Sequence, residues 1–235
     1  MGYAKQIPWN GLRGYITGMK NREIKQKIID TCLWLQEKDL VIGTWGNVSV
    51  RVGDEIILTP SRISYDIMTV EDMVTIDLDG NVTEGFRSPT TEREVHRMIY
   101  RVRDDVGSII HYHPRYASGM CATDQGIPCI TEEMSQLLGG AIPITPEYIR
   151  AGEHEKLGQA AAKYIGNKNA VLLRNHAPVC VGADLDEAIT CCQVLEKSAM
   201  IYMAAKAAGL NLMPIPDELI EVEHHRFKYD YGHEW

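Results

Sequence analysis

The spacing of apolar residues along the chain predicts helices in five regions. Between Asn21 and Asp39, apolar residues recur three or four positions apart with charged residues between them, which is typical of an amphipathic helix. The threonine pair and acidic residues of Thr90–Glu94 mark the start of a second helix that continues to Val102. The same criteria predict helices over residues 116–122, 153–165 and 184–208.

Short apolar runs between these helices predict strands. A glycine-rich turn over residues 43–47 leads into an alternating strand that reaches Arg51. Further strands are predicted at 55–59, 73–78, 108–113, 170–173 and 179–181. Several short strands with tight turns favour an antiparallel sheet, and together the elements predict an α/β fold.

Composition favours one soluble, cytoplasmic domain. The chain has 235 residues and 45% hydrophobic content, enough for one sizeable core. Neither a signal peptide nor a membrane-spanning run is evident, and the six scattered cysteines suggest reduced thiols. The excess of 32 acidic over 24 basic residues gives a net charge of −8, which argues against nucleic-acid or membrane partners.

The domain is expected to span residues 22–235, after an N-terminal extension of residues 1–21. Pro8, Gly11, Gly14 and Gly18 interrupt residues 1–20, so we expect this stretch to lie on the surface without a regular element. The sequence assigns it no chemistry.

Two histidines, His111 and His113, end the predicted strand over 108–113. Successive strand side chains point to opposite faces, so these two share a face and could bind one ion. A lone His-x-His pair is weak evidence for a metal site. His176 also lies where a predicted strand gives way to a turn, a place where sites in α/β proteins gather.

Three other features allow both a structural and a functional interpretation. The turn Gly43–Asn47 is either a plain loop or a cradle for a phosphate. Glu92 either stabilises a helix by placing negative charge at its positive end, or acts as an acid or base beside a metal. The pair Glu132 and Glu133 is either a solvated surface pair or part of a catalytic site. These residues by themselves do not separate the alternatives.

Five segments together resemble the motifs of one family. They are Gly43-Thr-Trp-Gly-Asn47, Thr59-Pro-Ser-Arg62, Pro89-Thr-Thr-Glu92, His111-Tyr-His113-Pro and Asn175-His176. In this order and at these intervals they resemble the class II aldolase/adducin-head family, and within it the zinc-dependent L-fuculose-1-phosphate aldolase group. The similarity covers nearly the whole chain, and the five motifs together are far more specific than any one of them.

The resemblance implies a three-layer α/β/α fold with a central, mainly antiparallel sheet. It also implies a homotetramer with active sites between subunits and a small phosphorylated sugar as substrate. His111, His113 and His176 would bind Zn²⁺, or another divalent ion such as Mn²⁺ or Co²⁺, and Glu92 would be the catalytic carboxylate. The positions that match the family's phosphate site are Gly46, Asn47, Ser61, Arg62, Thr90 and Thr91. Tyr231, with Tyr229 as the alternative, matches the tail tyrosine that reaches the active site.

The implied reaction is retro-aldol cleavage of a ketose 1-phosphate to dihydroxyacetone phosphate and an aldehyde. Fuculose 1-phosphate and 5-deoxy- or methylthio-ribulose 1-phosphate are candidate substrates. Related 4-epimerases carry aspartate where Glu92 stands, and related methylthioribulose-1-phosphate dehydratases place a glutamate near Glu133. These activities, a decarboxylase and a non-catalytic adducin-like binding module are the alternatives.

Overall fold

In the computed structural model, which describes residues 9–150 and 152–231, the centre of the chain is a seven-stranded sheet. Across the sheet the strands are β4 (Val82–Glu84), β3 (Val74–Asp77), β2 (Glu55–Leu58), β1 (Gly46–Val52), β5 (Ser108–Tyr112), β7 (Pro178–Gly182) and β6 (Ala170–Leu172). Every neighbouring pair runs antiparallel, so the predicted antiparallel sheet is confirmed.

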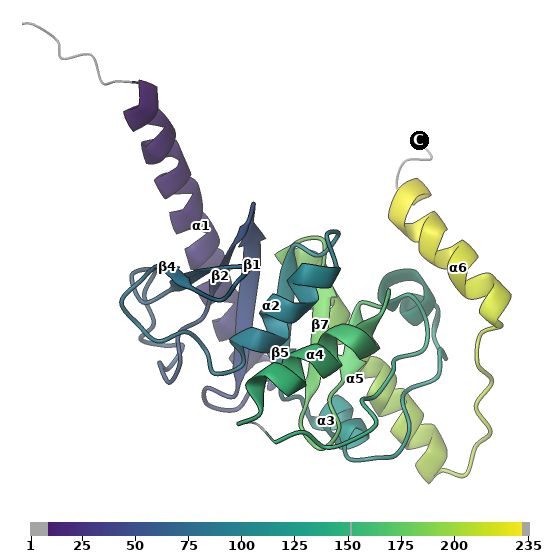
Figure 1. The fold of residues 1–235 in the computed structure, drawn as a ribbon. Coiled ribbons are helices and arrows are strands. Elements are labelled where there is room, and N and C mark those ends of the chain that lie inside the picture. The colour runs from purple at the N-terminus through teal and green to yellow at the C-terminus, as the bar shows by residue number, and fades with distance from the viewer. Residues whose placement is uncertain (1–8, 151, 232–235) are drawn as a thin grey trace, which may run out of the picture.

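Helices cover both faces of this sheet (Figure 1). The α-helices are α1 (Trp9–Glu37), α2 (Arg93–Val102), α3 (Arg115–Cys121), α4 (His154–Ile165), α5 (Leu185–Ala207) and α6 (Asp217–His225), and the π-helical turns are η1 (Met134–Leu138) and η2 (Arg226–Asp230). Ile109 of β5 packs in a cluster with α2 and α4, whereas Ile110 packs in a cluster with α1, α3 and α5. This alternation makes the sheet the middle of three layers, as the fold class predicted.

The N-terminal segment differs from the prediction. The helix expected from Asn21 already begins at Trp9, so residues 9–20 are helical rather than irregular. An interior glycine costs roughly 1 kcal/mol relative to alanine, but an established helix gains one hydrogen bond for each residue added. Glycines at positions 11, 14 and 18 therefore do not prevent helix formation here. Residues 1–8 lie outside the described residues, and the proposed boundary at residue 21 falls within α1.

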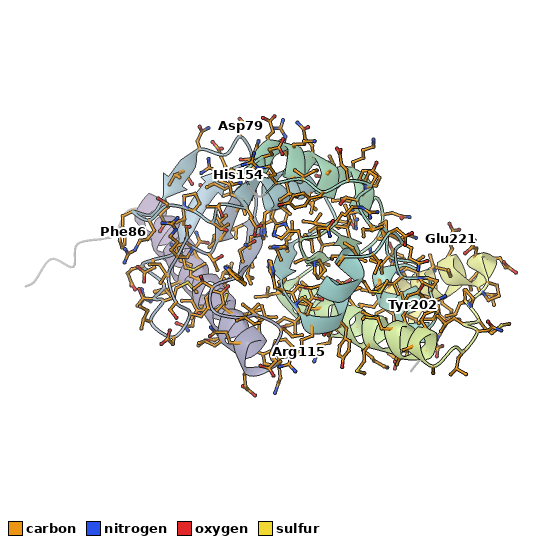
Figure 2. All side chains as sticks on the ribbon, turned by 90° about the horizontal axis from the view of Figure 1, so that it is seen from below. Asp79, Phe86, Arg115, His154, Tyr202 and Glu221 are labelled. Carbon is orange, nitrogen blue, oxygen red and sulfur yellow. The ribbon has the colours of Figure 1, made fainter. Side chains whose placement is uncertain are left out.

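The C-terminal region contains a helix that the sequence analysis did not identify. α6 begins after Pro216, and Asp217 and Glu218 lie in its first turn, where acidic groups suit the positive end of a helix. α6 and α1 lie at opposite ends of the molecule (Figure 1). In the view of Figure 2, Glu221 of α6 and Tyr202 of α5 lie at the end opposite Phe86, which follows the edge strand β4.

The core is held by packing without covalent links between its elements. All six cysteines are buried as free thiols, in agreement with the expectation of reduced cysteines. No helix in the described part of the chain has the length and apolar character needed to cross a membrane.

A close backbone contact fixes α2 against α4. A Cβ placed on Gly158 of α4 would lie 2.4 Å from the carbonyl oxygen of Glu94 and 3.1 Å from Cγ of Met98, both in α2. Only glycine allows this approach without displacement of a helix. Because Glu92 immediately precedes α2, the same contact contributes to the position of its side chain.

We predict that Gly158→Ala destabilises the protein by about 1–2 kcal/mol. Overpacking of this kind costs about 1–3 kcal/mol, and the better helix propensity of alanine offsets up to about 1 kcal/mol of it. Urea unfolding of both proteins measures the difference. Gly152→Ala is the matched control, since a Cβ there meets nothing within 4 Å. If Gly158→Ala and the wild-type protein were equally stable, α2 and α4 could move apart at no cost in free energy, and the prediction would be wrong.

Candidate metal centre

Three histidines come together at one end of the central strands. His111 lies in β5, His113 directly follows it, and His176 lies in the turn between β6 and β7. The ring centroids are 5.0 Å apart for His111 and His113, 4.9 Å for His111 and His176, and 5.3 Å for His113 and His176. Their potential ligand nitrogens all lie within 4.8 Å of one another. The predicted histidine cluster is therefore present as a spatial arrangement.

The backbone orients the most buried of these rings. His111 is fully buried, and its Nδ1 lies 2.9 Å from the carbonyl oxygen of Pro178. A carbonyl oxygen only accepts, so Nδ1 carries the hydrogen and Nε2 is left to face the cluster. A metal-binding histidine commonly donates its second nitrogen in this way, which fixes the tautomer of the ring.

Glu92 lies inside the histidine cluster. Its Oε2 is 3.2 Å from Nε2 of His111, and its Oε1 is 3.0 Å from Nε2 of His176. Nδ2 of Asn47 donates to Oε2 over 2.8 Å. The side chain of Glu92 makes no capping hydrogen bond at the start of α2, so the structure favours the functional over the capping interpretation.

The surroundings keep the Glu92 carboxyl group ionised. Burial by itself would raise its pKa, but the charge of His111 and hydrogen bonds from His111 and His176 outweigh burial and hold the pKa well below its usual range. Burial, with smaller contributions from His111 and His176, lowers the pKa of His113 to about 3. His113 is therefore a neutral imidazole near pH 7, the form that binds a metal ion.

The donor set fits a divalent metal of the zinc class. Three imidazole nitrogens with room for a further ligand are a known arrangement for catalytic zinc. Nδ1 of His176 is buried without a hydrogen-bond partner among the described residues, so nothing commits that ring to another role. The ionised Glu92 adds negative charge beside the nitrogens.

A pocket of about 560 Å³ opens onto the cluster. It is lined by Thr44, Trp45, Gly46, Asn47, Pro60, Ser61, Arg62, Thr90, Thr91, Glu92, His113, Asn175 and His176. All six residues predicted to bind phosphate are among them. The sequence analysis did not assign a site role to Trp45, whose ring centroid lies 6.3 Å from that of His113, although it stands within the glycine-rich motif.

Backbone hydrogen bonds tie two of the predicted phosphate segments together. The amide of Thr90 donates to the carbonyl oxygen of Thr59 over 3.1 Å, and the amide of Ser61 donates to that of Ser88 over 2.9 Å. The hydroxyl of Thr90 accepts a hydrogen bond from the amide of Glu92. These contacts place hydroxyl groups from two distant segments on one wall of the pocket.

Arg62 is the unusual member of that wall. Its backbone has φ of 62°, in the left-handed region that a residue with a Cβ seldom adopts. Its side chain is exposed, and no described acidic group forms an ion pair with it. The pocket therefore contains a guanidinium that is not neutralised by a neighbouring carboxylate.

The other sequence candidates lie outside the pocket of this chain. Glu133 forms an ion pair with Lys197 at 2.5 Å. Glu132 is exposed, and its carboxylate accepts a hydrogen bond from the side-chain amide of Gln136 over 3.2 Å. Tyr231 is 61% exposed and stacks on Phe227 in the C-terminal region, while Tyr229 is 59% exposed. Within one chain, the structure does not bring any of these side chains to the histidines.

Comparison with known proteins agrees with the resemblance. Residues 26–203 match the family described as Class II Aldolase and Adducin N-terminal domain. An L-fuculose phosphate aldolase of Haemophilus influenzae is 32% identical over 214 residues, which cover 91% of this chain and 97% of that protein. A solved structure of an L-fuculose 1-phosphate aldolase has a TM-score of 0.84 and 33% identity, and covers 88% of this chain and 97% of its own.

A relative with another activity is also similar. The L-ribulose-5-phosphate 4-epimerase UlaF of Salmonella paratyphi A is 29% identical over 210 residues, which cover 85% of this chain and 92% of that protein. The match to the family extends over most of the described sheet and its helices, including Glu92 and all three histidines. The chain belongs to the class II aldolase and adducin N-terminal domain family.

Proposed function

We propose that this protein catalyses metal-dependent retro-aldol cleavage of a ketose 1-phosphate to dihydroxyacetone phosphate and an aldehyde. The observation that carries the proposal is the position of Glu92, an ionised carboxylate 3.2 Å and 3.0 Å from two histidines at the base of the pocket. The similarity to L-fuculose phosphate aldolases over most of the chain supports the reaction class.

His111, His113 and His176 would hold the divalent ion on which class II aldolases depend, and we take this ion to be Zn²⁺, with Mn²⁺ or Co²⁺ as alternatives. When bound, the ion supplies a Lewis acid that polarises the substrate carbonyl. The hydrogen bond from His111 to Pro178 keeps Nε2 directed at the cluster, where Nε2 would give up its hydrogen bond to Glu92 in order to bind the ion. A reactive lysine is not needed for this chemistry.

Glu92 moves the proton at C3. In cleavage, the C4 hydroxyl loses its proton, the C3–C4 bond breaks, and its electron pair remains on C3 while C4 becomes the aldehyde. C3 then takes up a proton. Because the pKa of Glu92 is lowered, its resting form is the base, which removes the C3 proton of dihydroxyacetone phosphate in the condensation direction. By microscopic reversibility, cleavage uses the protonated form of Glu92, which takes up one proton from solvent and delivers it to C3, while the proton lost from the C4 hydroxyl passes to solvent.

The phosphate group is proposed to bind the wall formed by Gly46, Asn47, Ser61, Arg62, Thr90 and Thr91. Hydroxyl groups and the guanidinium of Arg62 supply donors suited to a phosphate dianion. The side chain of Asn47 already donates to Glu92, but an amide nitrogen has two hydrogens, so a second donor remains for the substrate.

The aldehyde end is proposed to be completed by a second copy of the chain. The family resemblance implies that a tail tyrosine reaches the active site, whereas Tyr231 of this chain stacks on Phe227 and is not among the residues that line its own pocket. A homotetramer in which Tyr231 reaches a neighbouring subunit would account for the difference. There it would exchange the proton of the C4 oxygen.

The alternative reactions have less support in this chain. Dehydration would need Glu133 near the substrate, but Glu133 pairs with Lys197. The epimerase relative keeps 4-epimerisation as a second candidate. Glutamate at position 92, where related epimerases have aspartate, favours aldol cleavage. A decarboxylase gains no specific support, and a binding module without a metal leaves the histidine cluster unexplained.

Metal removal tests the first part of the proposal. We expect about one divalent ion per chain by metal analysis, as a three-histidine site implies. His111→Ala should lose both the ion and the cleavage activity, and Zn²⁺ should restore chelator-treated wild-type protein. His225→Ala is the control, because the side chain of His225 is 68% exposed and outside the cluster. Metal-free protein that is fully active would contradict the assignment.

Glu92→Gln tests the acid–base assignment. Glutamine keeps the size of the side chain but cannot take a proton, so cleavage should fall by roughly 10²–10⁴-fold while the metal stays bound. In D₂O without an aldehyde, the wild-type protein should exchange the C3 hydrogen of dihydroxyacetone phosphate, and the variant should not. Glu133→Gln is the control. Normal exchange by Glu92→Gln would transfer the role to another group.

Arg62→Gly tests the proposed phosphate site. It removes the guanidinium, which should affect substrate affinity, and it relieves the positive φ, which should affect stability. Loss of a charged hydrogen bond, worth about 1.5–3 kcal/mol, should raise KM roughly 10- to 100-fold with little change in kcat. The variant should also be more stable by about 1 kcal/mol, because glycine adopts positive φ readily. Asp39→Gly is the control, since Asp39 has φ of 58° and is not among the residues that line the pocket. An unchanged KM for Arg62→Gly would exclude Arg62 from phosphate binding.

A further inference from the structure

A ladder of polar side chains runs from Glu92 into the core between α2 and β1. Nδ2 of Asn47 lies 2.8 Å from Glu92, Oδ1 of Asn47 lies 2.5 Å from Nε2 of His96, and Nδ1 of His96 lies 2.7 Å from Oγ of Ser49. The hydroxyl of Tyr100 completes the ladder 2.9 Å from the same Oγ. The proposed reaction uses only the Glu92 end.

The spacing of these residues explains why the two elements match. Asn47 and Ser49 are two positions apart on β1, and Glu92, His96 and Tyr100 are four apart at the start of α2 and along it. Two strand residues span about 6.7 Å, and four helical residues rise about 6 Å. The side chains of the strand therefore meet those of the helix at successive levels.

Every member beyond Glu92 is buried. His96, Ser49 and Tyr100 are fully buried, and Asn47 is 4% exposed. Buried polar groups are costly unless each is hydrogen-bonded, and a partly satisfied network is worse than an apolar core. An apolar residue at position 96 would pack here at lower cost, so simple filling of the core does not account for a histidine.

The donor and acceptor of each hydrogen bond in the ladder can be assigned by starting from the carboxylate of Glu92. A carboxylate only accepts, so Nδ2 of Asn47 donates to Glu92 and Oδ1 must accept from Nε2–H of His96. Burial lowers the pKa of His96 to about 3, which keeps the ring neutral with a single hydrogen. Nδ1 then accepts from the hydroxyl of Ser49, and Ser49 accepts from Tyr100.

We propose that His96 is a positioning residue that acts on Glu92 through Asn47. Its Nε2–H fixes the amide of Asn47 so that the NH₂ group, rather than the carbonyl oxygen, faces the carboxylate. The hydroxyl of Ser49, held by Tyr100, supports this tautomer of His96 by donating to Nδ1. If the amide rotated by half a turn, its oxygen would face the carboxylate of Glu92 and repel it. His96 thereby holds the carboxylate at the site of proton transfer without contact with the substrate.

Substitution of His96 tests this inference, which rests on the proposed role of Glu92. We expect His96→Leu to lower kcat for cleavage of the ketose phosphate roughly 10- to 100-fold, the usual cost of losing a residue that orients a catalytic group, with bound metal unchanged and with a rise in KM, through the amide of Asn47, that is smaller than the fall in kcat. His96→Gln should recover most of kcat, because its amide nitrogen can replace Nε2–H. In a Glu92→Gln background, His96→Leu should cause no further loss.

A crystal structure of His96→Leu gives a readout that does not depend on the reaction. The amide of Asn47 should be turned or displaced and the carboxylate of Glu92 shifted from His111, even if the wild-type protein proves to have another activity. An absence of aldol cleavage in the metal-loaded wild type would overturn the proposed function alone. An unmoved Glu92 in the variant would overturn the positioning role alone.

Two further variants keep the test decisive. Ser49→Ala removes one hydroxyl with minimal change in volume, so a smaller loss of kcat at constant KM is expected even if His96→Leu does not fold. His154→Leu applies the same substitution at the start of α4, where Nδ1 of His154 is buried without a hydrogen-bond partner among the described residues. The proposal would be refuted if Ser49→Ala lost substrate affinity and bound metal together with kcat. An unchanged kcat in Ser49→Ala would refute it as well.

Discussion

The buried negative charge of Glu92 is the constraint on which the site depends. A carboxylate removed from water is costly unless charges and hydrogen bonds compensate for it. The compensation comes from β1 through Asn47, from β5 through His111 and from the β6–β7 turn through His176. Four separated segments, including the start of α2, must therefore be placed together before the carboxylate is tolerated. The site thus acts as a test of correct packing across the middle of the sheet.

The antiparallel sheet provides this convergence by register. Asn47 is paired with His111 across β1 and β5, and His111 is paired with Val179 across β5 and β7. The chain reverses just before β7, so His176 arrives beside the same level of the sheet. The close contact between Gly158 and α2 fixes the start of α2, and thereby the direction from which the side chain of Glu92 reaches the histidines. Fold and site are linked through backbone geometry rather than through the histidines alone.

Local patterns in the sequence predicted the features that depend on local geometry. Alternation in a strand placed His111 and His113 on one face. The three-layer fold was implied by the family resemblance. The partnership with His176 depends on contacts between distant strands, and it came from the family resemblance. The ion pair between Glu133 and Lys197 is equally non-local. By contrast, the placement of Glu92 and His96 on one face of the predicted helix is evident from their spacing, because residues four apart on a helix share a face.

The histidines by themselves do not select a reaction, since aldolases and epimerases of the family share the fold. Selectivity must come from other groups of the pocket, among which Arg62 has an unusual backbone conformation. Its positive φ carries a cost of about 1–2 kcal/mol that glycine would avoid. Nothing in the described fold offsets that cost, because the guanidinium has no acidic partner there. If the phosphate binds as proposed, it would supply the missing partner, and the backbone conformation at Arg62 would then serve substrate binding rather than the stability of the fold.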